Sequence, residues 1–171
     1  MTLQFLRNQL DAELVITRDV LEVVRHAPLK WQPHPSSFTL GRLAMHVATI
    51  PSWLPAFAGS VAYDMGAGGP GPDVSTFNDE ILVRYEAAVD MAHATLDALD
   101  DAALAEAWTL LRDGMTVATM PRAEAISRYV VRHMVHHRGQ LTVYLRLCDL
   151  PIPAMYGDSA DCRLLPPDMV S

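Results

Sequence analysis

The chain has 171 residues, half of them hydrophobic, with 13 basic and 20 acidic residues and a formal net charge of −7. This length suits one domain that buries its own core, and the composition excludes a disordered chain. The acidic balance and the absence of a run of lysines and arginines argue against a nucleic-acid partner.

The N-terminal residues MTLQFLRNQLDAELVI have no long apolar core and include acids. We therefore expect neither a signal peptide nor a membrane anchor. The two cysteines, Cys148 and Cys162, are too few for a disulfide framework and lack the spacing of a thiolate metal site. A single domain over residues 1–171, cytoplasmic and without a membrane partner, is the resulting expectation.

Apolar residues recur at helical spacing in four long segments. The first runs from about Leu3 to Arg25 and ends before PLKWQPHPSS, whose three prolines are incompatible with a continuing helix. The second begins near Thr39, a plausible cap, and is bent or ended by Pro51 and Pro55. The stretch GSVAYDMGAGGPGPDVS that follows is rich in Gly and Pro and reads as a surface loop.

The third predicted helix runs from about Thr76 to Leu99, with Ser75 as its cap. In AWTLLRDGMTVATM, two short β-prone runs flank Arg-Asp-Gly, which predicts a small hairpin. Pro121 then opens a fourth helix that extends to about Leu147, because proline is favoured in the first helical turn. The proline-punctuated tail is expected to pack across the helices. Four main helices joined by one long crossover predict an all-α bundle.

Three of the seven histidines lie within five residues of the fourth helix, in RHMVHHRGQ. His133 and His137 are about 40° apart on the expected core face of that helix. Their i, i+4 spacing lets two imidazoles bind one cation. His46 lies between Leu43 and Val47 on the expected buried stripe of the second helix. Three imidazoles from two helices could therefore meet inside the bundle.

Other readings of these histidines stay open. A core histidine is more often simply hydrogen-bonded than a metal ligand, and structural roles explain about half of such pairs. His136 could pair with His133 at i, i+3 in place of His137. His93 on the third helix is expected to be an interface or core histidine.

The residues after His137 suggest supporting roles. Gln140 is placed to support the His137 ring from outside the ligand set. Gly139, costly inside a helix, suggests close approach of another backbone or room for a ligand. Arg138 is expected to be a solvated surface charge or to pair with an acid of the third helix such as Glu86.

Three neutral imidazoles would leave a divalent ion its full +2 charge and at least one exchangeable position, which suits activation of water or of a small thiol. The sequence offers no clear general base. Glu13 lies at the edge of the apolar stripe of the first helix, and Trp53 could line a pocket. The more common role is that of a surface acid for Glu13 and of a packing aromatic for Trp53.

Three blocks of sequence together carry a family resemblance. They are LGRLAMHVATIPSW, in which His46 precedes Trp53 by seven residues, HMVHHRGQL, and PIPAMYGDSAD. In order and content they resemble the DinB/YfiT-like family of metalloenzymes, whose fourth helix carries His-x-x-x-His-Arg-Gly-Gln. The tail departs from the family pattern at Asp158, where a proline is usual.

The resemblance implies an up-down-down-up four-helix bundle with a small β-hairpin before the last helix. It also implies a divalent metal, zinc or nickel, held by His46, His133 and His137. Gln140, His136 and Trp53 are expected around these ligands. Members are often homodimers.

Relatives of this kind include mycothiol-dependent maleylpyruvate isomerases and bacillithiol S-transferases. The function implied is that of a metal-dependent enzyme acting on a small molecule, either a hydrolase or an S-transferase with a low-molecular-weight thiol cosubstrate. The alternative is a non-catalytic metal-binding protein of the stress or damage response.

Overall fold

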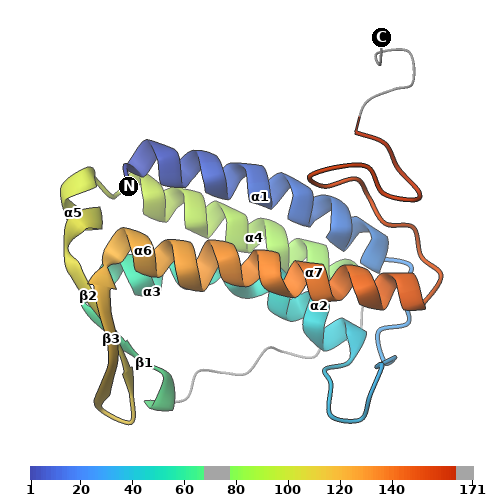
Figure 1. The fold of residues 1–171 in the computed structure, drawn as a ribbon, viewed down its shortest axis with the longest axis horizontal. Coiled ribbons are helices and arrows are strands. Elements are labelled where there is room, and N and C mark those ends of the chain that lie inside the picture. Colours follow the sequence, from blue (N-terminus) through green and yellow to red (C-terminus); the bar gives the residue numbers. More distant parts are fainter. Residues whose placement is uncertain (68–77, 165–171) are drawn as a thin grey trace.

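A computed structural model describes residues 1–67 and 78–164, in which long helical segments pack side by side (Figure 1). The helical elements are α1 (Leu3–Val24), α2 (Leu40–Thr49), η1 (Ile50–Trp53), α3 (Leu54–Gly59), η2 (Met65–Ala67), α4 (Asn78–Asp97), α5 (Asp101–Ala105), α6 (Arg122–Ile126), η3 (Ser127–Val131) and α7 (Arg132–Leu147). The strands are β1 (Ala62–Asp64), β2 (Ala107–Arg112) and β3 (Met115–Pro121). The predicted cap Ser75 lies outside the described residues.

Hydroxyl side chains cap the first two helices. The Thr2 hydroxyl oxygen accepts from the backbone N–H of Phe5 at 3.2 Å. Thr39, the predicted cap of α2, accepts in the same way from Arg42 at 3.3 Å. Each bond satisfies one of the N–H groups that a helix start leaves without an intrahelical partner, so these helices begin where the sequence predicts.

Two of the long segments are not regular α-helices throughout. Pro51 turns the end of α2 into the tighter 3₁₀ turn η1, after which α3 continues. The last segment contains a wide π turn, η3, between α6 and α7. Such π turns insert one extra residue and are common beside functional sites.

Contacts at the helix ends fix the directions of the segments. The Asn78 side chain, at the start of α4, donates to the carbonyl of Val24 at 2.7 Å, and Arg7 pairs with Asp97 at 2.6 Å. The helices α1 and α4 are therefore antiparallel neighbours. In Figure 1, α7 runs in the direction of α1, and α2 runs in the direction of α4.

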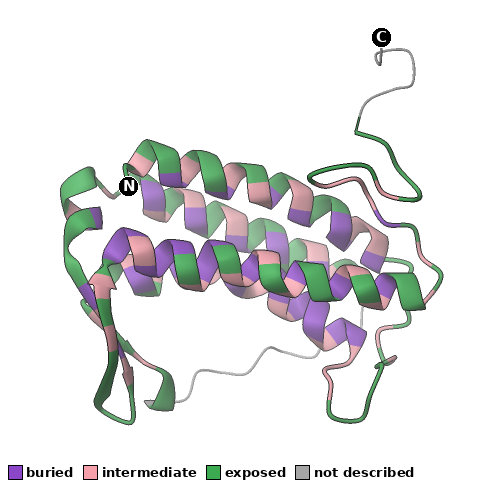
Figure 2. Cartoon of the chain, in the orientation of Figure 1, coloured by how far each residue is buried: buried purple, intermediate pink, exposed green. Residues whose placement is uncertain are grey.

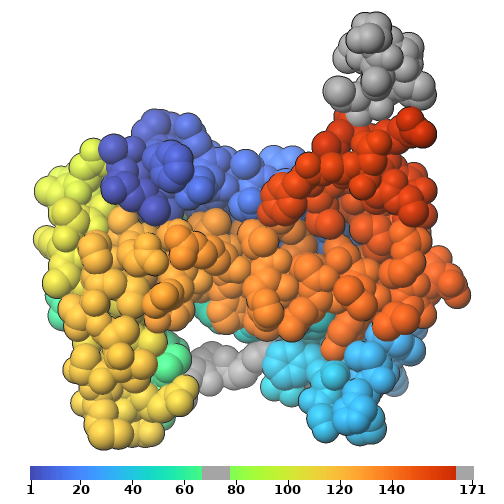
Figure 3. Space-filling model, viewed as in Figure 1, coloured from blue at the N-terminus to red at the C-terminus, as the bar shows by residue number. Residues whose placement is uncertain are grey.

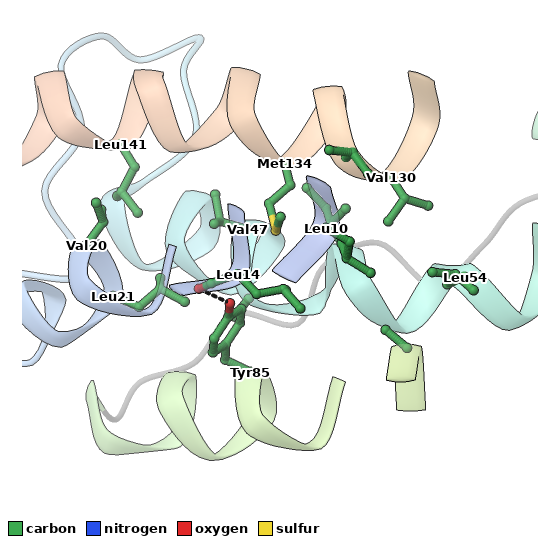
Figure 4. Packing of buried hydrophobic residues seen from close by; sticks show 14 of the residues in the cluster. Leu10, Leu14, Val20, Leu21, Val47, Leu54, Tyr85, Val130, Met134 and Leu141 are labelled. Atoms are coloured by element: carbon green, nitrogen blue, oxygen red, sulfur yellow. Dashed lines mark hydrogen bonds between the residues drawn. The ribbon is translucent and has the colours of Figure 1, made fainter. Parts of the chain in front are cut away.

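The core lies between these segments, and the buried faces of the helices point toward one another (Figure 2). Figure 4 shows part of the interior, in which the hydroxyl of Tyr85 on α4 donates to the Leu14 carbonyl on α1 at 2.6 Å. Residues of α1, α2, α3, η3 and α7 fill the space around this bond: Leu10, Val20, Leu21, Val47, Leu54, Val130, Met134 and Leu141. The apolar stripes predicted from the sequence thus form one shared core.

The predicted hairpin is present, but it belongs to a larger sheet. Strands β2 and β3 pair antiparallel through a turn in which Asp113 and Gly114 have φ of 52° and 75°, as a tight right-twisted hairpin requires. Strand β1 adds in parallel to β2, giving the order β1-β2-β3. The all-α prediction is thus confirmed in part: the chain is mostly helical, with a three-stranded sheet and several short helices beside the long segments. Among the described residues, no helix has the length and apolar character needed to cross a membrane.

Candidate metal centre

The structure brings three imidazoles together between α2 and α7. The Nε2 atoms of His46 and His133 are 3.1 Å apart. The ring centre of His137 lies 4.5 Å from that of His46 and 4.6 Å from that of His133. One nitrogen from each ring lies within 4.8 Å of the others. These three histidines are the only such group of potential metal ligands among the described residues.

The position of the cluster follows from the helix pair that carries it. His133 and His137 are one turn apart on α7, so their side chains lie over the same face. The neighbouring helix α2 crosses there in the opposite direction and presents His46. All three side chains are half-buried, whereas the sequence predicted buried rings. The cluster thus lies at the edge of the core, where solvent reaches it.

The spacing of the His46 and His133 ring nitrogens is compatible with a bound cation. A zinc ion lies about 2.0–2.1 Å from each imidazole nitrogen, so two ligands at tetrahedral or right angles are roughly 2.9–3.4 Å apart. The Nε2 atoms of His46 and His133 have this separation. The Nδ1 atom of His46 is buried and has no hydrogen-bond partner in the described part of the chain, which leaves the Nε2 of that ring as the nitrogen facing the cluster.

Burial keeps these imidazoles uncharged. Desolvation, followed by the mutual repulsion of the rings, lowers the pKa of His46 and of His133 to about 4. Desolvation also lowers the pKa of His137, although its hydrogen bond with Gln140 opposes the shift. At neutral pH the rings are therefore neutral, which is the form that binds a metal ion.

The three residues expected around the ligands lie beside them in different ways. Gln140 accepts a hydrogen bond from Nδ1 of His137 at 2.7 Å, which leaves Nε2 of that ring free. Trp53 packs edge-on against His133, with ring centres 5.2 Å apart, and against His46 as well. His136 is exposed and packs edge-on against the His137 ring, with ring centres 4.9 Å apart, but it is not a member of the cluster.

The prediction for Arg138 was wrong. Its side chain is 1% exposed, and it forms an ion pair with Glu13 of α1 at 2.6 Å, not with Glu86. The same guanidinium donates to the hydroxyls of Thr17, at 2.9 Å, and of Tyr156 in the C-terminal tail. Glu13, expected to be a surface acid, is thus the partner of a buried charge.

The apolar pattern of α7 contains the signal for this burial. Arg138 lies four residues after the buried Met134 and three before the buried Leu141, so it falls on the core stripe. Gly139 lies on the opposite, exposed side, where an added Cβ would meet no atom within 4 Å. Its presence is therefore not explained by close approach of another backbone.

Two further features lie away from the cluster. His93, expected to be an interface or core histidine, is partly exposed and bonds to Asp11 of α1 at 2.8 Å. A groove of about 370 Å³ between α1 and the start of α7 is lined in part by Phe5, Val131 and Val135. Because Val131 and Val135 occupy a different face of the helix from the imidazoles, this groove is separate from the candidate metal centre.

Fold and site define a mostly helical protein with a candidate three-histidine metal centre. The sequence profile of the DinB family matches residues 3–162, and the chain belongs to that family. Its fold is similar to the crystal structure of a DinB-like protein from Bacillus cereus ATCC 10987, with a TM-score of 0.72 and 23% sequence identity over 91% of this chain and 98% of that one. At this identity the likeness concerns the fold alone. No curated protein matches the sequence.

Proposed function

We propose that the protein binds one divalent metal ion, zinc or nickel, through His46, His133 and His137, and that it is a metal-dependent enzyme acting on a small molecule. The observation that carries this proposal is the convergence of three neutral imidazoles from two helices, with Nε2 atoms 3.1 Å apart. Nitrogen ligands of this kind suit both metals.

The surrounding residues support such a role. Gln140 holds the proton of His137 on Nδ1, and this orients the ring and leaves Nε2 as the ligand atom. Trp53 covers one side of the His46 and His133 rings and limits how they can turn. The cluster is half-buried, so a small molecule can approach it from solvent.

The chemistry proposed is either hydrolysis or transfer of a low-molecular-weight thiol. A divalent ion held by three neutral ligands supplies a Lewis acid that polarises a substrate and lowers the pKa of water or of a thiol. The imidazoles hold that charge in place, and the half-buried site keeps part of the bulk water away. Glu13, the acid considered from the sequence, is engaged by Arg138 and is not proposed as a base.

The alternative is a non-catalytic metal-binding protein of the stress or damage response. A structural zinc site is normally closed by four protein ligands. Within residues 1–67 and 78–164, the cluster contains three potential ligands and no fourth histidine, cysteine or acid. This favours an open, catalytic site over a structural one.

The wider organisation is proposed on family grounds. We propose one domain over residues 1–171, a homodimer in solution and a cytoplasmic location. Sedimentation equilibrium of purified protein tests the dimer, since a single species of twice the chain mass is the result we expect.

Elemental analysis of protein purified without a histidine tag tests the metal site. We expect about one zinc or nickel ion per chain, and less than a tenth of that in His137→Ala, because two remaining imidazoles form a weak site. The matched control is His93→Ala, which removes a histidine that contacts Asp11 instead of the cluster. Full metal content in His137→Ala would refute the assignment.

A substrate panel then separates enzyme from binding protein. Metal-loaded protein is incubated with esters, amides and thiol-plus-electrophile pairs, and the His137→Ala variant serves as the blank. Turnover that disappears in the variant supports the enzyme, whereas complete inactivity of the loaded protein favours the alternative.

A further inference from the structure

We propose that Arg42 determines substrate specificity at the three-histidine site by binding a carboxylate group of the small molecule. This inference rests on the proposed function and adds a substrate class to it. The reasons are the position of Arg42, its lack of an acidic partner and the charge balance of the site.

The first reason is position. Arg42 precedes His46 by one turn of α2. Its guanidinium carbon lies 4.1 Å from the centre of the Phe38 ring, in a cation–π contact. The same Phe38 ring packs edge-on against His46, with centres 6.3 Å apart. The Phe38 ring therefore contacts both the guanidinium and a candidate metal ligand, and its contact with the guanidinium helps to hold the charged group in place.

The second reason is that Arg42 has no acid to pair with. The other partly or fully buried arginines among the described residues, Arg7, Arg122 and Arg138, each form an ion pair. Arg42 is partly buried and forms none with any described residue, and its Nε atom is buried without a hydrogen-bond partner. A buried donor without a partner is costly, so it indicates that another molecule completes the site.

The third reason is charge. Arg42 lies one turn of α2 from His46, and the cluster of potential ligands contains no carboxylate of the described residues. A divalent ion on three neutral ligands would add to this positive charge. An anionic ligand would offset it, whereas a neutral ligand would leave the positive charge unbalanced.

The number of donors favours a carboxylate over a phosphate. A guanidinium matches the two oxygens of a carboxylate in a planar, bidentate pair. A phosphate carries more charge and more acceptor atoms, and binding it usually takes several cationic or backbone donors. At this position the structure offers one guanidinium.

The test measures binding of paired probes to zinc-loaded protein by titration calorimetry. The probes are 3-mercaptopropionate and 6-mercaptohexanoate, each compared with its neutral amide, so that the carboxylate is tested at two distances from the thiol. The net charge of −7 opposes anions at long range, so a preference for the acid reports local charge. We expect the acid to bind at least about 10-fold more tightly than its amide at one chain length or at both, which is the size of effect typical of a charge-assisted hydrogen bond.

The variant Arg42→Gln should remove this preference, and Arg42→Lys should keep part of it. Arg128→Gln is the matched control, because Arg128 is an exposed arginine without an ion pair among the described residues and should change nothing. Circular dichroism and zinc content establish that each variant is folded and loaded. A preference that survives in Arg42→Gln, or is absent from the wild type at both lengths, overturns the inference.

Two other outcomes are also decisive. Tighter binding of a phosphonate than of the matching carboxylate would overturn the assignment to a carboxylate. Failure of the wild type to bind zinc or nickel would contradict the proposed function and this inference with it. One zinc ion per chain without any acid preference would contradict this inference alone.

Discussion

At the scale of single residues, the imidazoles of His46 and His133 resist protonation. Each has a pKa of about 4 in the folded chain because burial disfavours the charged ring. In the unfolded chain a histidine has a pKa of about 6.5. Between these two values the unfolded chain binds more protons than the folded one, so acid favours unfolding.

The metal-free protein should therefore lose stability as the pH falls from about 6.5 to about 4. The contribution of the two rings is fully present above pH 6.5 and declines through this window. Urea unfolding at a series of pH values measures it as a fall in the free energy of unfolding. Replacing one ring, as in His133→Gln, should flatten the dependence, and an unchanged slope in that variant would contradict the assignment of the effect to His133.

Residue spacing predicted the members of the cluster better than it predicted their surroundings. The i, i+4 pair His133 and His137 and the position of His46 on an apolar stripe can be read from helical geometry alone. The environment of Arg42 cannot, because it depends on where Phe38 and the neighbouring acids lie in space. The prediction for Arg138 failed for a different reason. Arg138 lies on an apolar stripe and is buried because it pairs with Glu13, which is on another helix and far away in the sequence.

At the scale of elements, the buried guanidinium of Arg138 ties three segments together. It joins α7 to Glu13 and Thr17 of α1 and to Tyr156 of the tail, and Tyr156 also donates to the Glu13 carboxylate at 2.6 Å. Figure 3 shows the tail lying over α1 and α7 at one end of the bundle. Because Arg138 follows His137 directly, this network also fixes the part of α7 that carries the cluster.

Breaking the network should destabilise the protein strongly. We expect Arg138→Leu to cost about 3–5 kcal/mol, since it leaves the Glu13 carboxylate without its partner in a mostly buried place. Tyr156→Phe should cost about 1–2 kcal/mol, because its hydroxyl accepts a hydrogen bond from Arg138 and donates one to Glu13. Urea unfolding monitored by circular dichroism measures both losses.

A surface ion pair provides the comparison for these variants. Arg18 pairs with Glu86 at 2.7 Å, and both side chains are about half exposed. Arg18→Leu should therefore have a much smaller effect than Arg138→Leu, because exposed pairs contribute little to stability. Equal losses in the two arginine variants would show that the buried network has no special role.

Elements differ in how far local sequence specifies them. The apolar stripe predicted the bounds of α1, and the Thr39 cap predicted the start of α2, because helical periodicity and hydroxyl caps are local signals. Strand β1 spans only Ala62–Asp64, too short for an alternating pattern, and it exists because β2 offers a free edge. The π turn at η3 also carries no local signal that separates it from a regular helix.

At the scale of the whole molecule, the directions of the helices create the site. Because α2 and α7 are antiparallel neighbours, residues 87 positions apart meet with ring nitrogens 3.1 Å apart. The rest of the bundle, with its shared apolar core, holds this pair of helices in register. The proposed metal ion would join two of the long segments at their line of contact.

Diffraction at the absorption edge of the metal tests the metal site most directly. A crystal of protein purified without a tag should give one strong anomalous peak about 2.0–2.1 Å from a ring nitrogen of each of His46, His133 and His137. No peak at that place in crystals grown with excess zinc or nickel, or a peak that one of the three imidazoles does not reach, would contradict the three-histidine site.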